Sequence, residues 1–429
     1  MDLIQWFGNT VMGFCKQDPE KARRFLLTGY RANLLSLITH LPPSAMTKAN
    51  RYAAIHIMET IIRSLTRPKT CAMVSLFVPC EMLYSIGLAP YSLEAISGYI
   101  MGVSCEDACQ QKASEAGFSD TMCAYHMTYL GAAELGLMPP PRFIIYSNLA
   151  CDGNMITFPY LRDKHNVPSF YLDIPYEKSD DSVRYVASQL QVMQDFIEQM
   201  VGKHIPEERL HKAVRNSIAA KKDALATASY RKSHFLPTDM TNEMYSAFMS
   251  HILLGSDTAA KYFSLLREEN QKAPFGKAKR LLWLHTIPYM QPSLRNLINY
   301  SKDVSIAACD LTYDSFVSDW DEDDVYRAMA SRLVYSGYNG PVDDRIRYAL
   351  QMANVTGADG AIIFAHWGCK VTLGASKMLI QGLEERGIPA IILDGNGASP
   401  AATGDGQIRT RMEAFLEMLE ASSDDSLYL

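Results

Sequence analysis

The side chains in this sequence that are best suited to chemistry are its nine cysteines, spread along 429 residues. No two of them form a C-x-x-C pair, which disfavours a zinc ribbon and a thioredoxin-type redox motif. An odd number of cysteines in a long chain also argues against a disulfide framework. Thiolates gathered from distant segments suit an iron–sulfur cluster, because soft sulfur ligands are the usual choice there.

Three of these cysteines stand where ligands commonly bind. Cys151 and Cys369 each follow an apolar run typical of a strand and precede a helix-length segment. Cys123 comes at the start of a predicted helix, after the capping candidates Ser119 and Asp120. Ligands of open α/β sheets bind beyond the carboxyl ends of the strands, and a helix N-terminus favours the thiolate form of cysteine. We therefore expect Cys123, Cys151 and Cys369 to be metal ligands.

Two further cysteines are open to two interpretations. Cys80 stands between a predicted strand and a predicted helix, and Cys309 ends another predicted strand. Each is either an additional ligand or an ordinary buried side chain, because a strand end is also a core position. Cys105 and Cys109 are four residues apart on a predicted helix, which is weak grounds for a site.

Two histidines lie near the expected ligands. His126 is three residues after Cys123, and His366 is three residues before Cys369. A nucleophilic cysteine needs such a histidine as its base. We favour instead a structural role for each histidine, or a hydrogen-bonding role behind the metal ligands.

Nucleotide-binding motifs are absent from the sequence. There is no G-x-x-x-x-G-K-[ST] loop, and the segment GNGASP at 395–400 fails the dinucleotide fingerprint at its last glycine. Any ATP or NAD chemistry is therefore expected to come from a partner.

The elements that would position these residues alternate between strands and helices from about residue 71. Short apolar runs separated by helix-length segments are typical of parallel α/β sheets with covered faces. The expected strands are 73–78, 142–147, 169–173, 280–285, 304–308, 361–365 and 390–394. The predicted fold class is α/β, with two Rossmann- or flavodoxin-like parallel-sheet domains.

The predicted organisation has four regions. They are a helical N-terminal region (1–70), a first α/β domain (71–205), a helical bridge (206–275) and a second α/β domain (276–429). Both α/β domains contain a strand, a cysteine, a helix and a further strand in the same order, which indicates an internal repeat. Cys151 and Cys369 occupy the equivalent position in the two copies.

The overall composition excludes some partners. The net charge is −6 and the pI is near 6.0, so there is no basic field for nucleic acid or anionic lipid. The sequence contains no run of about 18 apolar residues, which is the length that a membrane-spanning helix needs. The first residues lack the pattern of a signal peptide, so the expected compartment is the cytoplasm.

Several segments together resemble the 2-hydroxyacyl-CoA dehydratase family, which includes the subunits of benzoyl-CoA reductase. The resemblance covers about residues 71–418. The segments that carry it are CDG at 151–153, HWGCK at 366–370, the tail at 407–418, VPCE at 78–81 and the stretch at 167–173.

The resemblance implies a [4Fe–4S] cluster held by Cys123, Cys151 and Cys369 between the two α/β domains, with one iron left open. It implies an ATP-hydrolysing iron–sulfur activator that supplies one electron, and a related second subunit or a homodimer. The family reaction is anaerobic: a ketyl radical forms from a 2-hydroxyacyl-CoA thioester, and water is then eliminated. Glu81, within the matched segment 78–81, is our candidate catalytic residue.

Departures from the family pattern keep two alternatives open. Cys80 and Cys309 are extra thiols at strand ends, and they suggest the family branch with a double-cubane [8Fe–9S] cluster. That branch is homodimeric and reduces small molecules. The other alternative is an iron–sulfur electron carrier that catalyses no reaction.

Overall fold

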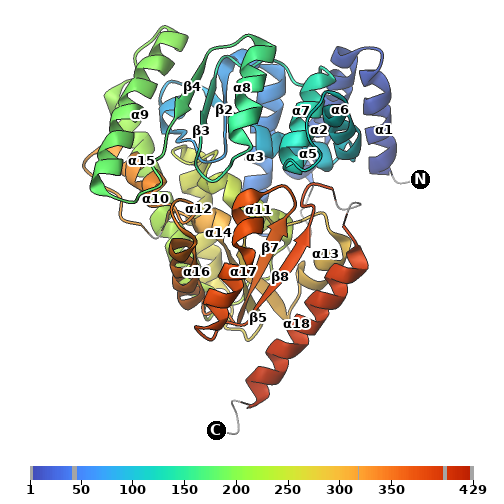
Figure 1. Ribbon diagram of the computed structural model, residues 1–429, viewed down its shortest axis with the longest axis vertical. Helices are drawn as coiled ribbons and strands as arrows, with labels where there is room; N and C mark the ends of the chain where they lie inside the picture. The colour runs from blue at the N-terminus through green and yellow to red at the C-terminus, as the bar shows by residue number, and fades with distance from the viewer. Residues whose placement is uncertain (1–2, 41–45, 317, 400–402, 426–429) are drawn as a thin grey trace.

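Two parallel sheets form the framework of the molecule (Figure 1). The computed structural model describes residues 3–40, 46–316, 318–399 and 403–425. In the first sheet the strand order is β2-β1-β3-β4, with β1 Cys71–Val74, β2 Ala89–Ser92, β3 Ile144–Ser147 and β4 Ser169–Leu172. In the second it is β6-β5-β7-β8, with β5 Lys279–Leu284, β6 Val304–Cys309, β7 Gly360–His366 and β8 Ala390–Gly395.

The two sheets have the same strand order, and all of their strand pairs are parallel. This confirms the predicted α/β class and the internal repeat. Strands β1, β3, β6 and β7 are buried along their whole length, because helices cover both faces of a parallel sheet. Their near-continuous apolar sequences follow from that burial.

The structure differs from the expected strands in two places. Strand β1 ends at Val74, and the predicted continuation through Val78 is a turn. Strand β2, a further strand of the first sheet, was not expected, because it contains Pro90. It lies at the edge of its sheet, where proline is tolerated because no neighbour needs its missing N–H.

Helices surround each sheet. The N-terminal helices α1 to α3 lie beside the first sheet, which is drawn above the second in Figure 1. Their bounds are α1 Leu3–Cys15, α2 Pro19–Thr39 and α3 Lys48–Thr66, followed by a 3₁₀ turn at Pro68–Thr70. The first unit continues with α4 Glu81–Ser85, α5 Leu93–Met101, α6 Glu106–Glu115, α7 Ala124–Glu134, α8 Asn154–His165 and α9 Asp180–Val201.

The middle and C-terminal helices complete the molecule. The predicted bridge contains α10 Glu207–Tyr230, α11 Met240–Ser250 and α12 Asp257–Lys272. The second unit has α13 Pro292–Ile298, α14 Asp310–Tyr313, α15 Val325–Val334, α16 Val342–Thr356, α17 Lys370–Glu384 and α18 Asp405–Asp425. Helix α10 contacts α4 of the first unit and α16 of the second, so the bridge packs against both.

One contiguous hydrophobic core runs through both units. Helix α15 of the second unit packs against α9 of the first, so the two halves are interlocked rather than tethered. Among the described residues, no helix is long and apolar enough to span a membrane.

Candidate functional site

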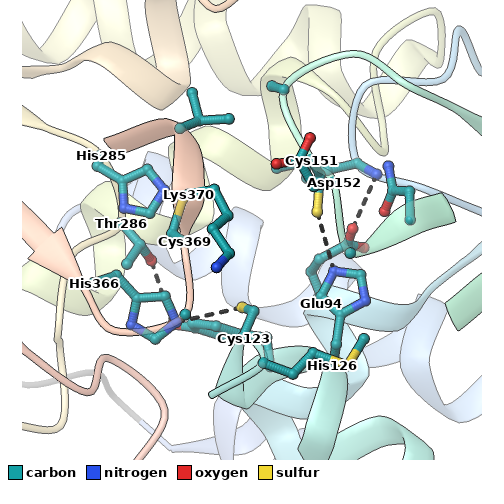
Figure 2. Close-up of a pocket in the computed structure, with 18 of the residues that line it drawn as sticks. Glu94, Cys123, His126, Cys151, Asp152, His285, Thr286, His366, Cys369 and Lys370 are labelled. Carbon is teal, nitrogen blue, oxygen red and sulfur yellow. Dashed lines mark hydrogen bonds between the residues drawn. The ribbon is translucent and has the colours of Figure 1, made fainter. Parts of the chain in front are cut away.

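A cavity of about 420 Å³ opens at the carboxyl ends of the strands, and residues of both units line it. Cys123, Cys151 and Cys369 are all among the lining residues. Cys151 lies between β3 and α8, while Cys369 is the N-cap residue of α17 and comes shortly after β7. Cys123 is the N-cap residue of α7, one position before its first turn. The three cysteines expected as ligands therefore share one cavity (Figure 2).

The two repeated cysteine loops use the same backbone turn. The residue before Cys151 is Ala150, with φ of 59°, and the residue before Cys369 is Gly368, with φ of 82°. Both are left-handed, a conformation that costs a residue with a Cβ about 1–2 kcal/mol. A Cβ at Gly368 would also lie 2.6 Å from the backbone nitrogen of Cys123. Glycine therefore lets a loop of the second unit approach the Cys123 backbone of the first.

Each of the three sulfurs faces the Nε2 atom of a different histidine. The distance is 3.3 Å from Cys123 to His366 and 3.2 Å from Cys151 to His126. Cys369 lies 3.3 Å from the Nε2 atom of a third histidine. Figure 2 shows the first two contacts as dashed lines across the cavity.

Each of these cysteines contacts a histidine other than the one nearest to it in the sequence. His126 contacts Cys151 rather than its neighbour Cys123, and His366 contacts Cys123 rather than its neighbour Cys369. The partner of Cys369 is His285, which directly follows β5. The histidines thus join loops that are distant in the chain.

Burial keeps these groups neutral. It raises the pKa of the Cys123 thiol to about 12 and raises the pKa values of Cys151 and Cys369 as well. Burial also lowers the pKa of His126 to about 4 and those of His285 and His366 to about 3. Thiolates at this site therefore need a cationic partner, which a metal centre supplies when it displaces the thiol protons.

The spacing of the sulfurs does not suit a single ion. Thiolates around one zinc ion lie within about 4 Å of one another, because each bond is about 2.3 Å long. Within the described parts of the chain, no three His, Cys, Asp or Glu side chains gather closely enough for one ion. A cluster offers each thiolate a different iron, so a cavity lined by three cysteines that do not gather around one point fits a cluster better than a single ion.

Charged groups also line the cavity. Burial raises the pKa of Glu94, which follows β2; its Oε1 accepts the Leu76 N–H (3.2 Å), and its Oε2 accepts the Ser92 hydroxyl (3.0 Å). Asp152 and Lys370 each directly follow a cysteine and are exposed. In Figure 2, the Lys370 side chain extends from the start of α17 into the cavity.

The other predicted site residues lie outside the cavity lining. Cys80 and Cys309 are fully buried, and their thiols donate to the carbonyl oxygens of Val78 and His285. Glu81 is also buried and is not among the lining residues. Its carboxylate accepts hydrogen bonds from the guanidinium of a buried arginine and from a serine hydroxyl.

Cys105 and Cys109 are likewise buried and lie at and near the start of α6, away from the cavity lining. Sequence reasoning missed His285 and Glu94. His285 ends the predicted strand 280–285, so the rule that flagged the cysteines applies to it too. Glu94 carried no such signal, because the strand before it was not expected.

The fold and the site define a two-unit α/β protein with a three-cysteine cavity between its units. A family profile described as 2-hydroxyglutaryl-CoA dehydratase, D-component, matches residues 75–419. The chain therefore belongs to this family, and the match confirms the resemblance and leaves α1 to α3 outside it.

The named relatives have low sequence identity to this chain, but the similarity covers about two thirds or more of it. The α-subunit of (R)-phenyllactyl-CoA dehydratase from Clostridium sporogenes is 24% identical, over 74% of this chain and 82% of that protein. A benzoyl-CoA reductase subunit from Thauera aromatica is 23% identical, over 72% of this chain and 79% of that protein. The α-subunit of (R)-2-hydroxyglutaryl-CoA dehydratase from Acidaminococcus fermentans is 22% identical, over 67% of this chain and 62% of that protein.

Proposed function

We propose that this chain is the cluster-bearing subunit of a 2-hydroxyacyl-CoA dehydratase, and that Cys123, Cys151 and Cys369 hold a [4Fe–4S] cluster. The observation that carries the proposal is the convergence of these cysteines, from three distant segments, on one cavity. Membership of the family and the names of the relatives support the reaction class.

When bound, the cluster would supply a low-potential electron and an open Lewis-acidic iron for the thioester. The chain itself would supply proton transfer. Glu94 has its carboxyl in the cavity wall, and its raised pKa lets Oε1 or Oε2 hold a proton closer to neutral pH. We assign Glu94, in place of Glu81, as the group that exchanges a proton with the substrate.

The lining of the cavity supports an apolar acyl group as part of the substrate. Phe118, Met122, Ile156 and Phe248 form apolar wall, which excludes water around the reacting atoms. Lys370 is positioned to bind an anionic or carbonyl oxygen of the ligand at the mouth of the cavity.

Two partners follow from the same proposal. The sequence has no phosphate-binding loop, so a separate ATP-hydrolysing iron–sulfur activator would reduce the cluster. The relatives are named as subunits, which supports a related second subunit. The reducing cytoplasm would keep the nine free thiols reduced. ATP hydrolysis by the purified chain alone would contradict this division of labour.

Metal analysis of protein purified without oxygen tests the cluster. We expect about four irons per wild-type chain and loss of most iron in Cys151→Ala and in Cys369→Ala. Cys71→Ala is the matched control, because Cys71 is buried in β1 away from the cavity lining. Iron at the wild-type level in both site variants would contradict the assignment of these cysteines as cluster ligands.

The same measurement separates a single cluster from the double-cubane alternative. Cys80 and Cys309 donate to backbone carbonyls outside the cavity lining, which supports the smaller cluster. We expect the Cys80→Ser, Cys309→Ser double variant to keep its full iron complement. A loss of about half the iron would favour the homodimeric reductase.

A further inference from the structure

The contact between His366 and Cys123 has a defined direction. The backbone N–H of Gly397 donates to Nδ1 of His366 over 3.0 Å. An imidazole nitrogen that accepts a hydrogen bond carries no proton, so the proton of the neutral ring is on Nε2. Nε2 is the atom that faces Cys123, so it donates its N–H to the sulfur.

The other two histidines meet the same requirement once their cysteines are thiolates. A thiolate only accepts hydrogen bonds, so the contacts of Cys151 and Cys369 are hydrogen bonds in the tautomer that carries its proton on Nε2. The Nδ1 atom of His126 lies 2.8 Å from the hydroxyl of Thr157, which can donate to it. In that tautomer each sulfur of the site has one imidazole N–H donor.

Rigid backbone holds these rings in place. His285 has φ of 81°, a strained conformation for a residue with a Cβ, and its own N–H donates to Asp310. Asp310 is buried and paired with Arg345. His366 is the last residue of the fully buried strand β7.

We propose that His126, His285 and His366 are positioning residues that donate Nε2–H hydrogen bonds to the three ligand sulfurs and thereby raise the reduction potential of the cluster. The inference rests on the proposed function. Reduction adds negative charge that spreads onto the sulfurs, so donors to sulfur stabilise the reduced state more than the oxidised state.

The contact between His366 and Cys123 has a second consequence. His366 belongs to the loop of Cys369 but acts on Cys123, so one histidine links the ligands of the two units. A change at His366 should therefore alter the iron bound by Cys123, which is 243 residues away in sequence.

Redox titration of the cluster, followed by its electron paramagnetic resonance, tests the inference. In His366→Leu we expect the ratio of reduced to oxidised cluster to fall about tenfold at the wild-type midpoint, which for one electron is about 59 mV. His366→Gln places an amide N–H near the position of Nε2 and should restore most of the ratio. His251→Leu is the control, because His251 is also buried, its pKa is also lowered by burial, and its Nε2 atom bonds to the carbonyl of Leu311 instead of a cysteine.

If His366→Leu loses its cluster, a measurement on the wild-type protein still tests the inference. With ¹⁵N-labelled histidine, the reduced cluster should show ¹⁵N hyperfine coupling that weakens in His366→Gln. Full iron without that coupling, or a wild-type midpoint in His366→Leu, would overturn the inference and leave the cluster assignment standing. A wild-type chain without iron would overturn both.

Discussion

At the scale of single residues, surroundings give the same thiol different roles. Cys123, Cys151 and Cys369 face imidazole nitrogens in a shared cavity. Cys309 ends β6 and Cys80 is the N-cap residue of α4, yet their thiols donate to backbone carbonyls within the core. The side-chain type predicts the chemistry, while the neighbouring donor or acceptor decides whether it is available.

Glu94→Gln tests the proton-transfer role. Glutamine has the same shape, and its amide can keep hydrogen bonds to Leu76 and Ser92, so the cavity should stay intact. We expect kcat for water elimination to fall by about 10²–10⁴ with little change in KM, the usual effect of losing a general acid or base. Glu106→Gln is the control, because burial also raises the pKa of Glu106, to about 7, outside the cavity lining. Equal activity of both variants would remove Glu94 from the mechanism.

Gly368→Ala tests the close approach of the two cysteine loops. A methyl group there meets backbone atoms of Met122 and Cys123 at 2.6 Å, and its φ of 82° adds about 1–2 kcal/mol of strain. We expect a lower melting temperature and reduced iron content. Gly374→Ala within α17 meets nothing within 4 Å and should be neutral or stabilising by up to about 1 kcal/mol. Similar behaviour of the two variants would contradict the steric argument.

At the scale of elements, the C-terminal ends of α11 and α14 meet at a buried acid. Asp314 is the C-cap residue of α14, and its Oδ1 lies 3.3 Å from the Nε2 atom of His251, the C-cap residue of α11. Its Oδ2 accepts the Ser336 hydroxyl. Burial raises the pKa of Asp314 from 3.8 to about 7, so the folded protein holds a proton here that the unfolded chain releases.

This proton makes stability depend on pH. Between about pH 4 and pH 7 Asp314 keeps a proton in the folded state that it has lost in the unfolded state, so its own contribution to stability falls as the pH rises through that window. The loss is on the order of 2–4 kcal/mol. Asp314→Asn has no such titration, so its melting temperature relative to that of the wild type should rise between pH 5 and pH 8. A constant difference between the two melting temperatures over this range would show that Asp314 is not protonated in the fold.

At the scale of the whole molecule, a buried ion pair joins the two units. Glu81 of α4 accepts hydrogen bonds from both terminal nitrogens of Arg332 in α15, with a shortest distance of 2.6 Å. Ser217 of α10 donates to the same carboxylate. The residue that sequence reasoning favoured for catalysis therefore links three elements outside the cavity lining.

Removing one partner should cost more than removing both. Arg332→Met leaves a buried carboxylate without its partner, and such losses cost about 3–5 kcal/mol. The Glu81→Gln, Arg332→Met double variant removes both charges and should recover much of that stability. Thermal unfolding of the single and double variants measures the difference. A double variant less stable than either single variant would contradict the pairing.

The α/β class, the internal repeat and the three cysteines of the cavity could be predicted from the amino-acid sequence alone. Those conclusions depend on local patterns: apolar runs bounded by turns, and the position of a residue between a strand and a helix. The short edge strand β2 escaped prediction because Pro90 argues against a strand unless its edge position is known.

Which side chains contact one another in the site could be seen only in the folded chain. Sequence neighbours suggested Cys123 with His126 and Cys369 with His366, but the folded chain pairs each sulfur with a histidine from another segment. Hydrogen bonds are set by distance in space, and strand ends brought together by two sheets bear no fixed relation to spacing along the chain. For the same reason the buried partners of Cys80, Glu81 and Cys309 could be identified only once the two units were packed together.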